Sequence, residues 1–421
     1  MVSMGSLTSF PPELLSHILS FLPGKELATA AKVCKAFHEA SKVDFVWQRC
    51  MDREFGVSCA SSLSPSPREI YTKLLHKYGF LLGTWQIEIK PYGGLVHVMF
   101  QNNRLLGMQY GAPHDPHVDW PMMKKELFHV MLDDEGNTTI NCLQGPQGPH
   151  KGQIPLINAS SARFMSKCCC PDLHRHPQGR EQEFLEWCRE EMGVSEEDTM
   201  FQHMQELLFM KFMIINQYQF CYVYKRLTIP PHLPEQVIAP GLFKGTYGSH
   251  GLEIVLLTYD RHYIHCKKIT GDPNVPASEH SVLVDTKKPL ILDEEQQVDP
   301  AELARVTEQA EKEEEEMNGN GAGTNQSQEA EASGSDHGVS PQHIPQSQPF
   351  AIPEGFRERG INYPKTCKMR YCGTGLIAGH GFTSPSRTPG HFVVFDNENF
   401  GFLWLELRSL SVYSRVMENL D

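Results

Sequence analysis

Residues 6–50 predict the first folded unit of the chain, and they read SLTSFPPELLSHILSFLPGKELATAAKVCKAFHEASKVDFVWQRC. Pro11 and Pro12 stand where a first helical turn accepts proline, because the N–H that proline lacks has no partner there. Apolar residues then recur at helical spacing until Pro23-Gly24 ends the run. Two more helical segments follow, the last of them reaching Trp47. We therefore expect three short helices, and a unit this small leaves apolar side chains for a partner to cover.

The order of residues in this stretch resembles the F-box. The resemblance implies that residues 5–52 form a three-helix F-box that docks on the small Skp adaptor of a cullin–RING ubiquitin ligase. The alternative is an ordinary helical hairpin that caps the following domain. The residues that carry the resemblance, and that we expect to bind the adaptor, are Pro11, Leu14, Leu15, Ile18, Leu22, Leu27, Val33, Phe37 and Trp47.

Length and composition set the limits on function. The chain has 421 residues, 40% of them hydrophobic, and a formal net charge of −13. The length allows two or three domains, and the negative charge disfavours nucleic acid and membrane surfaces as partners. No apolar run approaches the length of a transmembrane helix, and we see no secretory signal. The 12 cysteines should therefore be reduced thiols or metal ligands.

Behind the F-box the period of the sequence changes from helical to alternating. Residues 53–79 read as linking helices, and short alternating strands follow over 80–292 and again over 350–415. Glycine-rich segments recur before these strands. Because glycine permits a close approach of the backbone, they favour closure of a small antiparallel β-barrel. Residues 180–217 interrupt the strands as a helical insertion. The expected fold class is α+β, with the F-box followed by one antiparallel β-barrel that serves as the substrate-binding domain.

Residues 293–349 differ in composition from the rest of the chain. Glu308 to Glu316 form a charge run, and the residues after it are mostly Gly, Asn, Ser, Gln, Glu and Ala. Such a segment buries too little apolar surface to offset the entropy of ordering. We expect a long disordered acidic loop inserted in the barrel. A transient, solvated helix over residues 300–316 is compatible with this expectation.

Cysteines and histidines cluster between residues 142 and 188. Structural zinc is bound by four nitrogen or sulfur ligands in a tetrahedron, and Cys₂His₂ is a common set. The spacing is wider than in a zinc finger, so free cysteines with surface histidines are an alternative. Three consecutive cysteines leave the choice of ligand open, and His176 could replace His174. The candidates are Cys142, His150, Cys168, Cys169, Cys170, His174, His176 and Cys188.

Motifs for catalysis are missing, whereas peptide recognition has candidates. The chain has no P-loop and no Gly-x-Ser-x-Gly nucleophile elbow, so we expect no enzyme. At a barrel mouth, Asp272 could accept hydrogen bonds from a ligand N–H, and Lys268 could hold a carboxylate. Tyr247, His250 and His380 lie in glycine-rich turns that would line the same end. Plain closure turns and an ordinary Asp turn before proline are the alternatives.

Long motifs behind the F-box resemble the F-box only protein 31 family, and they span the chain to Tyr413 apart from the acidic segment. The chain starts almost at the F-box. Any regulation that depends on an N-terminal extension of the relatives is therefore in doubt for this chain. The motifs are Lys73–Tyr78, Pro91–Leu95, Pro113–Val118, Gly241–Glu253, Lys268–Asn274 and Gly373–Pro385.

The family resemblance implies a function in the ubiquitin conjugation pathway. It implies a non-catalytic substrate receptor that binds the C-terminal tails of D-type cyclins and of C-terminally amidated proteins for degradation, in cell-cycle control and the DNA-damage response. It implies a structural zinc site on Cys142, His150, Cys168 and His174, and it places Asp272 in the tail pocket. We expect the chain in the cytoplasm, and also in the nucleus and at the centrosome. The competing hypotheses are a lipocalin-like barrel that holds a small molecule and is tethered through the F-box, and a zinc-dependent hydrolase.

Overall fold

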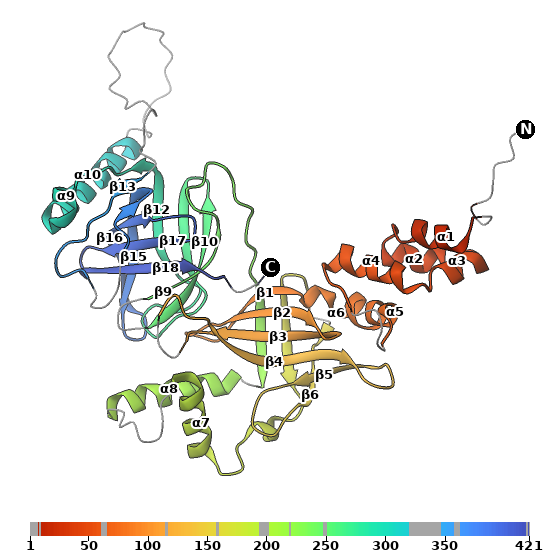
Figure 1. Ribbon diagram of the computed structural model, residues 1–421. Coiled ribbons are helices and arrows are strands. Elements are labelled where there is room, and N and C mark those ends of the chain that lie inside the picture. Colours follow the sequence, from red (N-terminus) through yellow and green to blue (C-terminus); the bar gives the residue numbers. More distant parts are fainter. Residues whose placement is uncertain are drawn as a thin grey trace, which may run out of the picture.

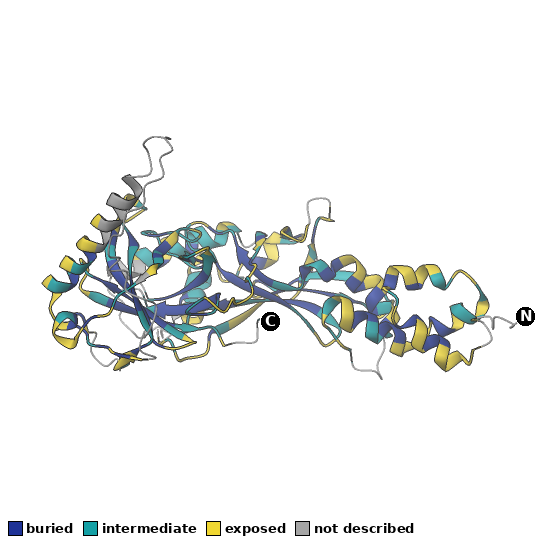
Figure 2. Ribbon diagram, turned by 90° about the horizontal axis from the view of Figure 1, so that it is seen from above, coloured by how far each residue is buried: buried dark blue, intermediate teal, exposed yellow. Residues whose placement is uncertain are grey.

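The computed structural model describes residues 7, 10–59, 65–113, 117–156, 160–192, 202–218, 220–246, 251–319, 347–357, 363–417 and 420. A helical unit at the N-terminus is followed by two β-barrels (Figure 1). The first barrel lies between the helical unit and the second barrel, and the helical unit projects from one end of the molecule (Figure 2). Among the described residues, no helix has the length and apolar character needed to span a membrane.

The helical unit has four helices in the described part of the F-box stretch, where the sequence predicted three. The second predicted helix is divided, because the chain turns after α2 and Cys34 is extended, with φ −158° and ψ 167°. No proline or glycine marks this break, so the periodicity alone did not reveal it. The helices are α1 (Pro12–Leu19), α2 (Gly24–Ala30), α3 (Lys35–Ala40) and α4 (Asp44–Phe55).

A continuous helical segment links this unit to the first barrel. Glu54 at the end of α4 accepts hydrogen bonds from the Gly24 N–H at 2.8 Å and from the Tyr71 hydroxyl at 2.6 Å. A Cβ on Gly24 would lie 2.2 Å from the Tyr71 ring, so only glycine permits this approach. The helices therefore pack on the linking segment as one hydrophobic core. That segment consists of α5 (Pro67–Glu69), the π-helical η2 (Ile70–Leu75), α6 (His76–Tyr78) and η3 (Gly79–Leu81).

The first barrel closes on itself before the second begins. Its eight strands pair in sequence order, and Trp85 on β1 is opposite Arg226 on β8. The rings of Trp85, Phe128, Phe164 and Tyr224 lie in its core. The strands are β1 (Gly83–Ile87), β2 (Leu95–Gln101), β3 (Arg104–Gly111), β4 (Met123–Leu132), β5 (Thr138–Cys142), β6 (His150–Gln153), β7 (Arg163–Cys168) and β8 (Cys221–Arg226).

Two helices are inserted between β7 and β8, as the sequence predicted. They are α7 (Arg180–Met192) and α8 (Gln202–Tyr218), preceded by the short 3₁₀ turn η5 (Pro171–His174). The rings of Phe184, Trp187 and Phe212 pack between the two helices.

The second barrel corrects the expectation of a single barrel over 80–292 and 350–415. Its strands close in the order β10-β11-β12-β15-β16-β17-β18-β9. Gly83 and Gly241 therefore each begin the first strand of a separate barrel. Strand alternation reports local structure only, whereas closure depends on pairing between strands far apart in sequence. The strands are β9 (Gly241–Thr246), β10 (Leu252–Asp260), β11 (Tyr263–Lys268), β12 (His280–Pro289), β15 (Met369–Gly379), β16 (Thr383–Val394), β17 (Asn399–Trp404) and β18 (Ser409–Arg415).

Part of the segment predicted to be disordered is helical and packed. It contains α9 (Glu294–Val298) and α10 (Pro300–Gly319), and the pair β13 (Gln348–Pro349) and β14 (Thr366–Cys367) follows. Leu303 of α10 is fully buried, and the Thr307 hydroxyl lies 2.9 Å from Nε2 of His391 on β16. These two residues face the barrel. The prediction of disorder missed them because it was based on the acidic composition of the whole segment. Residues 320–346 of the predicted loop lie outside the described residues.

The two barrels are joined by hydrogen bonds as well as by apolar contacts. The Gln86 side-chain amide on β1 donates to the carbonyl of Ile269 at 3.0 Å. The N–H groups of Gly271 and Ala277 donate to the carbonyls of Tyr92 and Pro91, at 2.9 and 2.7 Å. The connection between β11 and β12 therefore lies against the β1–β2 turn of the first barrel.

Candidate functional site

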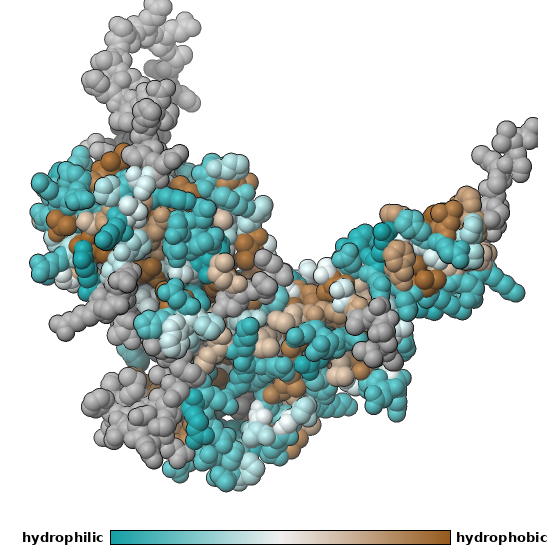
Figure 3. Space-filling view, in the orientation of Figure 1, coloured by the Kyte–Doolittle hydropathy of each residue, from teal (hydrophilic) through white to brown (hydrophobic). Residues whose placement is uncertain are grey.

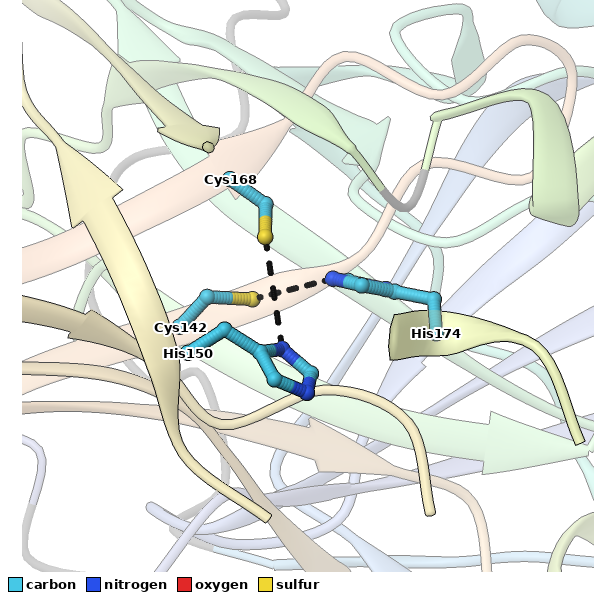
Figure 4. A group of neighbouring side chains, drawn as sticks. All are labelled: Cys142, His150, Cys168 and His174. Atoms are coloured by element: carbon cyan, nitrogen blue, oxygen red, sulfur yellow. Dashed lines mark hydrogen bonds between the residues drawn. The ribbon is translucent and has the colours of Figure 1, made fainter. Parts of the chain in front are cut away.

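Four buried side chains of the first barrel converge on one point (Figure 4). They are Cys142, His150, Cys168 and His174, and one possible ligand atom from each lies within 4.8 Å of the other three. The Cys142 sulfur is 3.6 Å from Nε2 of His174, and the Cys168 sulfur is 4.0 Å from Nδ1 of His150. This arrangement could hold a metal ion.

The strand register explains why residues far apart in sequence meet here. Cys142 ends β5 and is directly opposite His150, the first residue of β6. Cys168 ends β7, opposite Gly152. His174 is brought over this strand edge by η5, and the approach depends on Gly145. Gly145 has φ +87°, and a Cβ there would lie 2.7 Å from Cα of His174.

Burial dominates the electrostatics of Cys142 and His150 and keeps these side chains neutral without a cation. Burial is the main cause that raises the pKa of the Cys142 thiol to about 12, and the neighbouring Cys168 and Cys170 raise it further. Burial lowers the pKa of His150, which keeps this ring neutral and able to coordinate. The N–H of Cys170 donates to the Cys168 sulfur at 3.3 Å. A bound cation would offset the cost of ionising thiols in this buried place.

The remaining Cys and His candidates lie outside the group. Cys169 is exposed and Cys170 is half-buried. His176 turns to the helical insertion, where its Nε2 lies 3.2 Å from Glu186, and Cys188 is buried within α7. The geometry thus brings together the four residues that the family resemblance implied.

The nine residues predicted to bind an adaptor divide into three sets by their exposure. Leu15, Leu27 and Trp47 are buried at 3%, 0% and 3% exposure, so they hold the helices together. Leu22 and Phe37 are half-buried. The exposed members are Pro11, Leu14, Ile18 and Val33.

Apolar side chains gather on the exposed surface of the F-box helices (Figure 3). The sequence reasoning missed several of them, because helical spacing marks apolar residues without saying which ones stay uncovered. For a helical unit this small, so much exposed apolar surface indicates a protein-binding face. The exposed large apolar residues of this unit are Leu7, Phe10, Leu14, Ile18, Phe21, Val33, Val43 and Phe45.

Among the residues predicted to bind a peptide, Asp272 and His380 lie in two different turns of the second barrel. Asp272 lies in the β11–β12 connection at the barrel junction, where Oδ1 accepts from the N–H groups of Asn274 and Val275 at 3.0 and 2.7 Å. His380 is exposed at the β15–β16 turn. Tyr247 and His250 lie outside the described residues.

Lys268 is fully buried, and the prediction missed its partner Glu253. Its Nζ lies 2.8 and 2.6 Å from the two carboxylate oxygens of Glu253, on the neighbouring strand β10. The signal in the sequence was the carboxylate of Glu253 among the otherwise apolar residues 252–257 of β10.

Aromatic side chains occupy the interior of the second barrel. Phe400 lies 5.0 Å from Phe243, 4.9 Å from Phe392 and 4.7 Å from Tyr413, measured between ring centres. Phe402 packs against Trp404 in the same core. This packed core argues against a lipocalin-like internal site and against a tail pocket deep inside the barrel.

Comparisons with known proteins cover both halves of the chain. A family model described as F-box-like matches residues 7–52, and one described as Cyclin D1 binding domain matches residues 224–419. The chain is 44% identical to F-box only protein 31 of Mus musculus, over 98% of this chain and 85% of that protein. It is 42% identical to F-box only protein 31 of Homo sapiens, over 98% and 83%. It is 41% identical to F-box only protein 31-B of Xenopus laevis, over 99% and 84%.

Proposed function

The chain belongs to the F-box only protein 31 family, and from that premise we propose that it is the substrate-recognition subunit of an SCF-type ubiquitin ligase. Its F-box docks on the Skp adaptor, and its second barrel holds the C-terminal tails of client proteins. The clients are D-type cyclins and C-terminally amidated proteins, which are ubiquitinated and degraded in cell-cycle control and the DNA-damage response. The cullin–RING partner performs the transfer, so this chain supplies proximity and no catalytic group. It acts in the cytoplasm, the nucleus and at the centrosome.

The observation that carries the proposal is the separation of two family matches along one chain. The F-box match ends at residue 52, and the Cyclin D1 binding domain match begins at residue 224. The F-box helices lie at one end of the molecule and the second barrel at the other (Figure 2). A receptor needs this arrangement, because the adaptor and the client must be bound at the same time.

The adaptor side of the proposal rests on exposed apolar side chains. Leu14, Ile18 and Val33 are 43%, 38% and 69% exposed, although each is a large apolar residue. Covering them with a partner removes apolar surface from water, at roughly 25 cal/mol per Å². The buried Leu15 and Trp47 keep the helices in place beneath this surface.

The client side of the proposal places the tail at the barrel junction, on the Asp272 turn. The Asp272 charge reaches the neighbouring barrel, since the pKa of Tyr92 is raised by burial and further by Asp272. An acceptor-only carboxylate favours a tail that ends in an amide, which donates N–H groups, over one that ends in a carboxylate. Tyr247, His250 and His380 complete the proposed tail site, and Lys268 supports it by fixing Glu253 beneath the turn.

The metal part of the proposal is a structural zinc ion held by Cys142, His150, Cys168 and His174. Zinc–sulfur and zinc–nitrogen bonds of about 2.3 and 2.0 Å in a tetrahedron separate the two ligand atoms by roughly 3.5 Å. The 3.6 Å between the Cys142 sulfur and Nε2 of His174 agrees with this spacing. The ion would cross-link the ends of β5, β6 and β7 to η5.

The test is co-purification with the Skp adaptor, followed by titration of C-terminal peptides that differ only in an amide or acid end. The wild-type chain should bind the amide form more tightly. Asp272→Asn should reduce this preference, because an amide side chain also donates while its oxygen still accepts from Asn274 and Val275. Asp260→Asn, an exposed change in the same barrel, is the matched control. Equal affinities for both peptide ends in the wild type would refute the tail site.

A further inference from the structure

A group of basic side chains crosses the junction between the two barrels. His265 and Lys267 are on β11, His280 on β12, Arg387 on β16 and Lys225 on β8 of the first barrel. Lys267 and His280 are directly opposite each other, and the rings of His265 and His280 lie 5.4 Å apart. Arg387 reaches the same place, because its Nη2 donates to the His280 carbonyl at 2.7 Å. We call these five residues the junction basic surface.

The groups of this surface repel one another in the free protein. The pKa of His280 is lowered by burial first, and then by His265, Lys267 and Arg387. The pKa of Lys267 is lowered by burial and by Lys225 across the junction. Glu279 is the acidic group that offsets these charges. Within the described parts of the chain, the ion pairs involve residues other than Lys225, Lys267 and Arg387.

We propose that the junction basic surface binds an acidic stretch of the client polypeptide, a few residues before the C-terminal end held at the Asp272 turn. The proposal rests on the function proposed above, and it adds a second specificity element to the same client. Charge complementarity favours an acidic partner, because an approaching carboxylate relieves the repulsion between like charges. The chain's net charge of −13 disfavours nucleic acid as the occupant.

The chain length between the two sites limits the position of the acidic residues in the client. Lys267 lies five residues before Asp272, so the two are at most about 17 Å apart at 3.3 Å per residue, and less because β11 ends at Lys268. An extended client covers this upper limit in about five residues. We therefore expect carboxylates within about six residues of the client's last residue to strengthen binding.

The test uses pairs of C-terminal peptides with one end and one length, whose upstream Glu residues are replaced by Gln in one member. Fluorescence anisotropy with the full chain should give about fivefold tighter binding for the acidic peptide at low salt, and less at high salt. Lys225→Gln/Lys267→Gln should remove this difference and leave the neutral peptide unaffected. Lys365→Gln, an exposed lysine beside β14, should keep it.

A second readout is the pH dependence of binding. Burial and the neighbouring basic groups lower the pKa of His280 in the free protein, and an acidic segment beside this ring raises that pKa, so protons are taken up on binding. The acidic peptide should therefore bind more tightly at pH 6 than at pH 8. His280→Gln should remove this dependence.

The possible failures are distinguishable. Equal affinity of the two peptides for the wild type overturns the junction basic surface and leaves the tail site intact. Failure of both peptides to bind overturns the tail site as well. Preference for a phosphorylated peptide over the Glu peptide, or for a single-stranded oligonucleotide, shows another ligand class and also overturns the proposal.

Discussion

Replacing Lys268 with methionine removes the ammonium group from a buried ion pair and is expected to destabilise the second barrel. The Lys268 and Glu253 side chains are 1% and 5% exposed, and the closest distance between their charged atoms is 2.6 Å. Without Lys268, the Glu253 carboxylate stays buried and loses its counter-charge. Breaking a buried ion pair in this way costs about 3–5 kcal/mol.

Thermal unfolding measures this cost. For a domain of this size, 1 kcal/mol corresponds to about 2–4 °C, so Tm should fall by roughly 6–20 °C. Lys268→Met/Glu253→Leu should recover most of the loss, since an apolar pair carries no desolvation penalty. Lys267→Met, at the neighbouring half-buried lysine, should change the stability by no more than about 0.5 kcal/mol.

The outcome also separates two roles for Lys268. A stable Lys268→Met variant that loses affinity for free-acid peptides would refute the ion-pair account and return Lys268 to the role of a carboxylate binder. A destabilised variant that the Glu253→Leu change rescues would support the account.

Three further changes test other parts of the molecule. Arg370→Met should leave Tm equal to or above that of the wild type. Its guanidinium is buried, with a pKa lowered to about 10, and finds no hydrogen-bond acceptor among the described residues; a large fall in Tm would contradict this. Chelation or Cys168→Ser should lower Tm by on the order of 10 °C, whereas Cys169→Ser at the exposed neighbour should not; equal effects would refute the metal centre. Ile18→Glu should weaken adaptor binding at least about tenfold at unchanged Tm, while Leu407→Glu, an equally apolar exposed site on the second barrel, should not; retained adaptor binding would contradict the docking surface.

Local patterns in the sequence predicted the local parts of the fold. The prolines and apolar spacing of the F-box and the helical insertion over 180–217 depend on residues close together in the chain. Closure of the first barrel depends on Trp85 meeting Arg226, more than 140 residues later. No periodicity reports such a pairing, so one barrel was predicted in place of two.

The metal centre and α10 also depend on contacts between residues far apart in the sequence, which local patterns do not report. Residue type alone favoured a Cys₂His₂ group. Only the strand register separates Cys168 from Cys169, and only the turn of η5 separates His174 from His176. In α10, acidic composition predicted disorder, while the helix buries Leu303 and bonds through Thr307.

The most direct test of the receptor account measures adaptor affinity and tail-peptide affinity on the same two variants. The account predicts that Ile18→Glu loses the adaptor and keeps the tail peptide, and that Asp272→Asn keeps the adaptor and loses its preference for the amidated end. If either variant changes both affinities together, or if Asp272→Asn changes neither, the division of labour between F-box and barrel is contradicted.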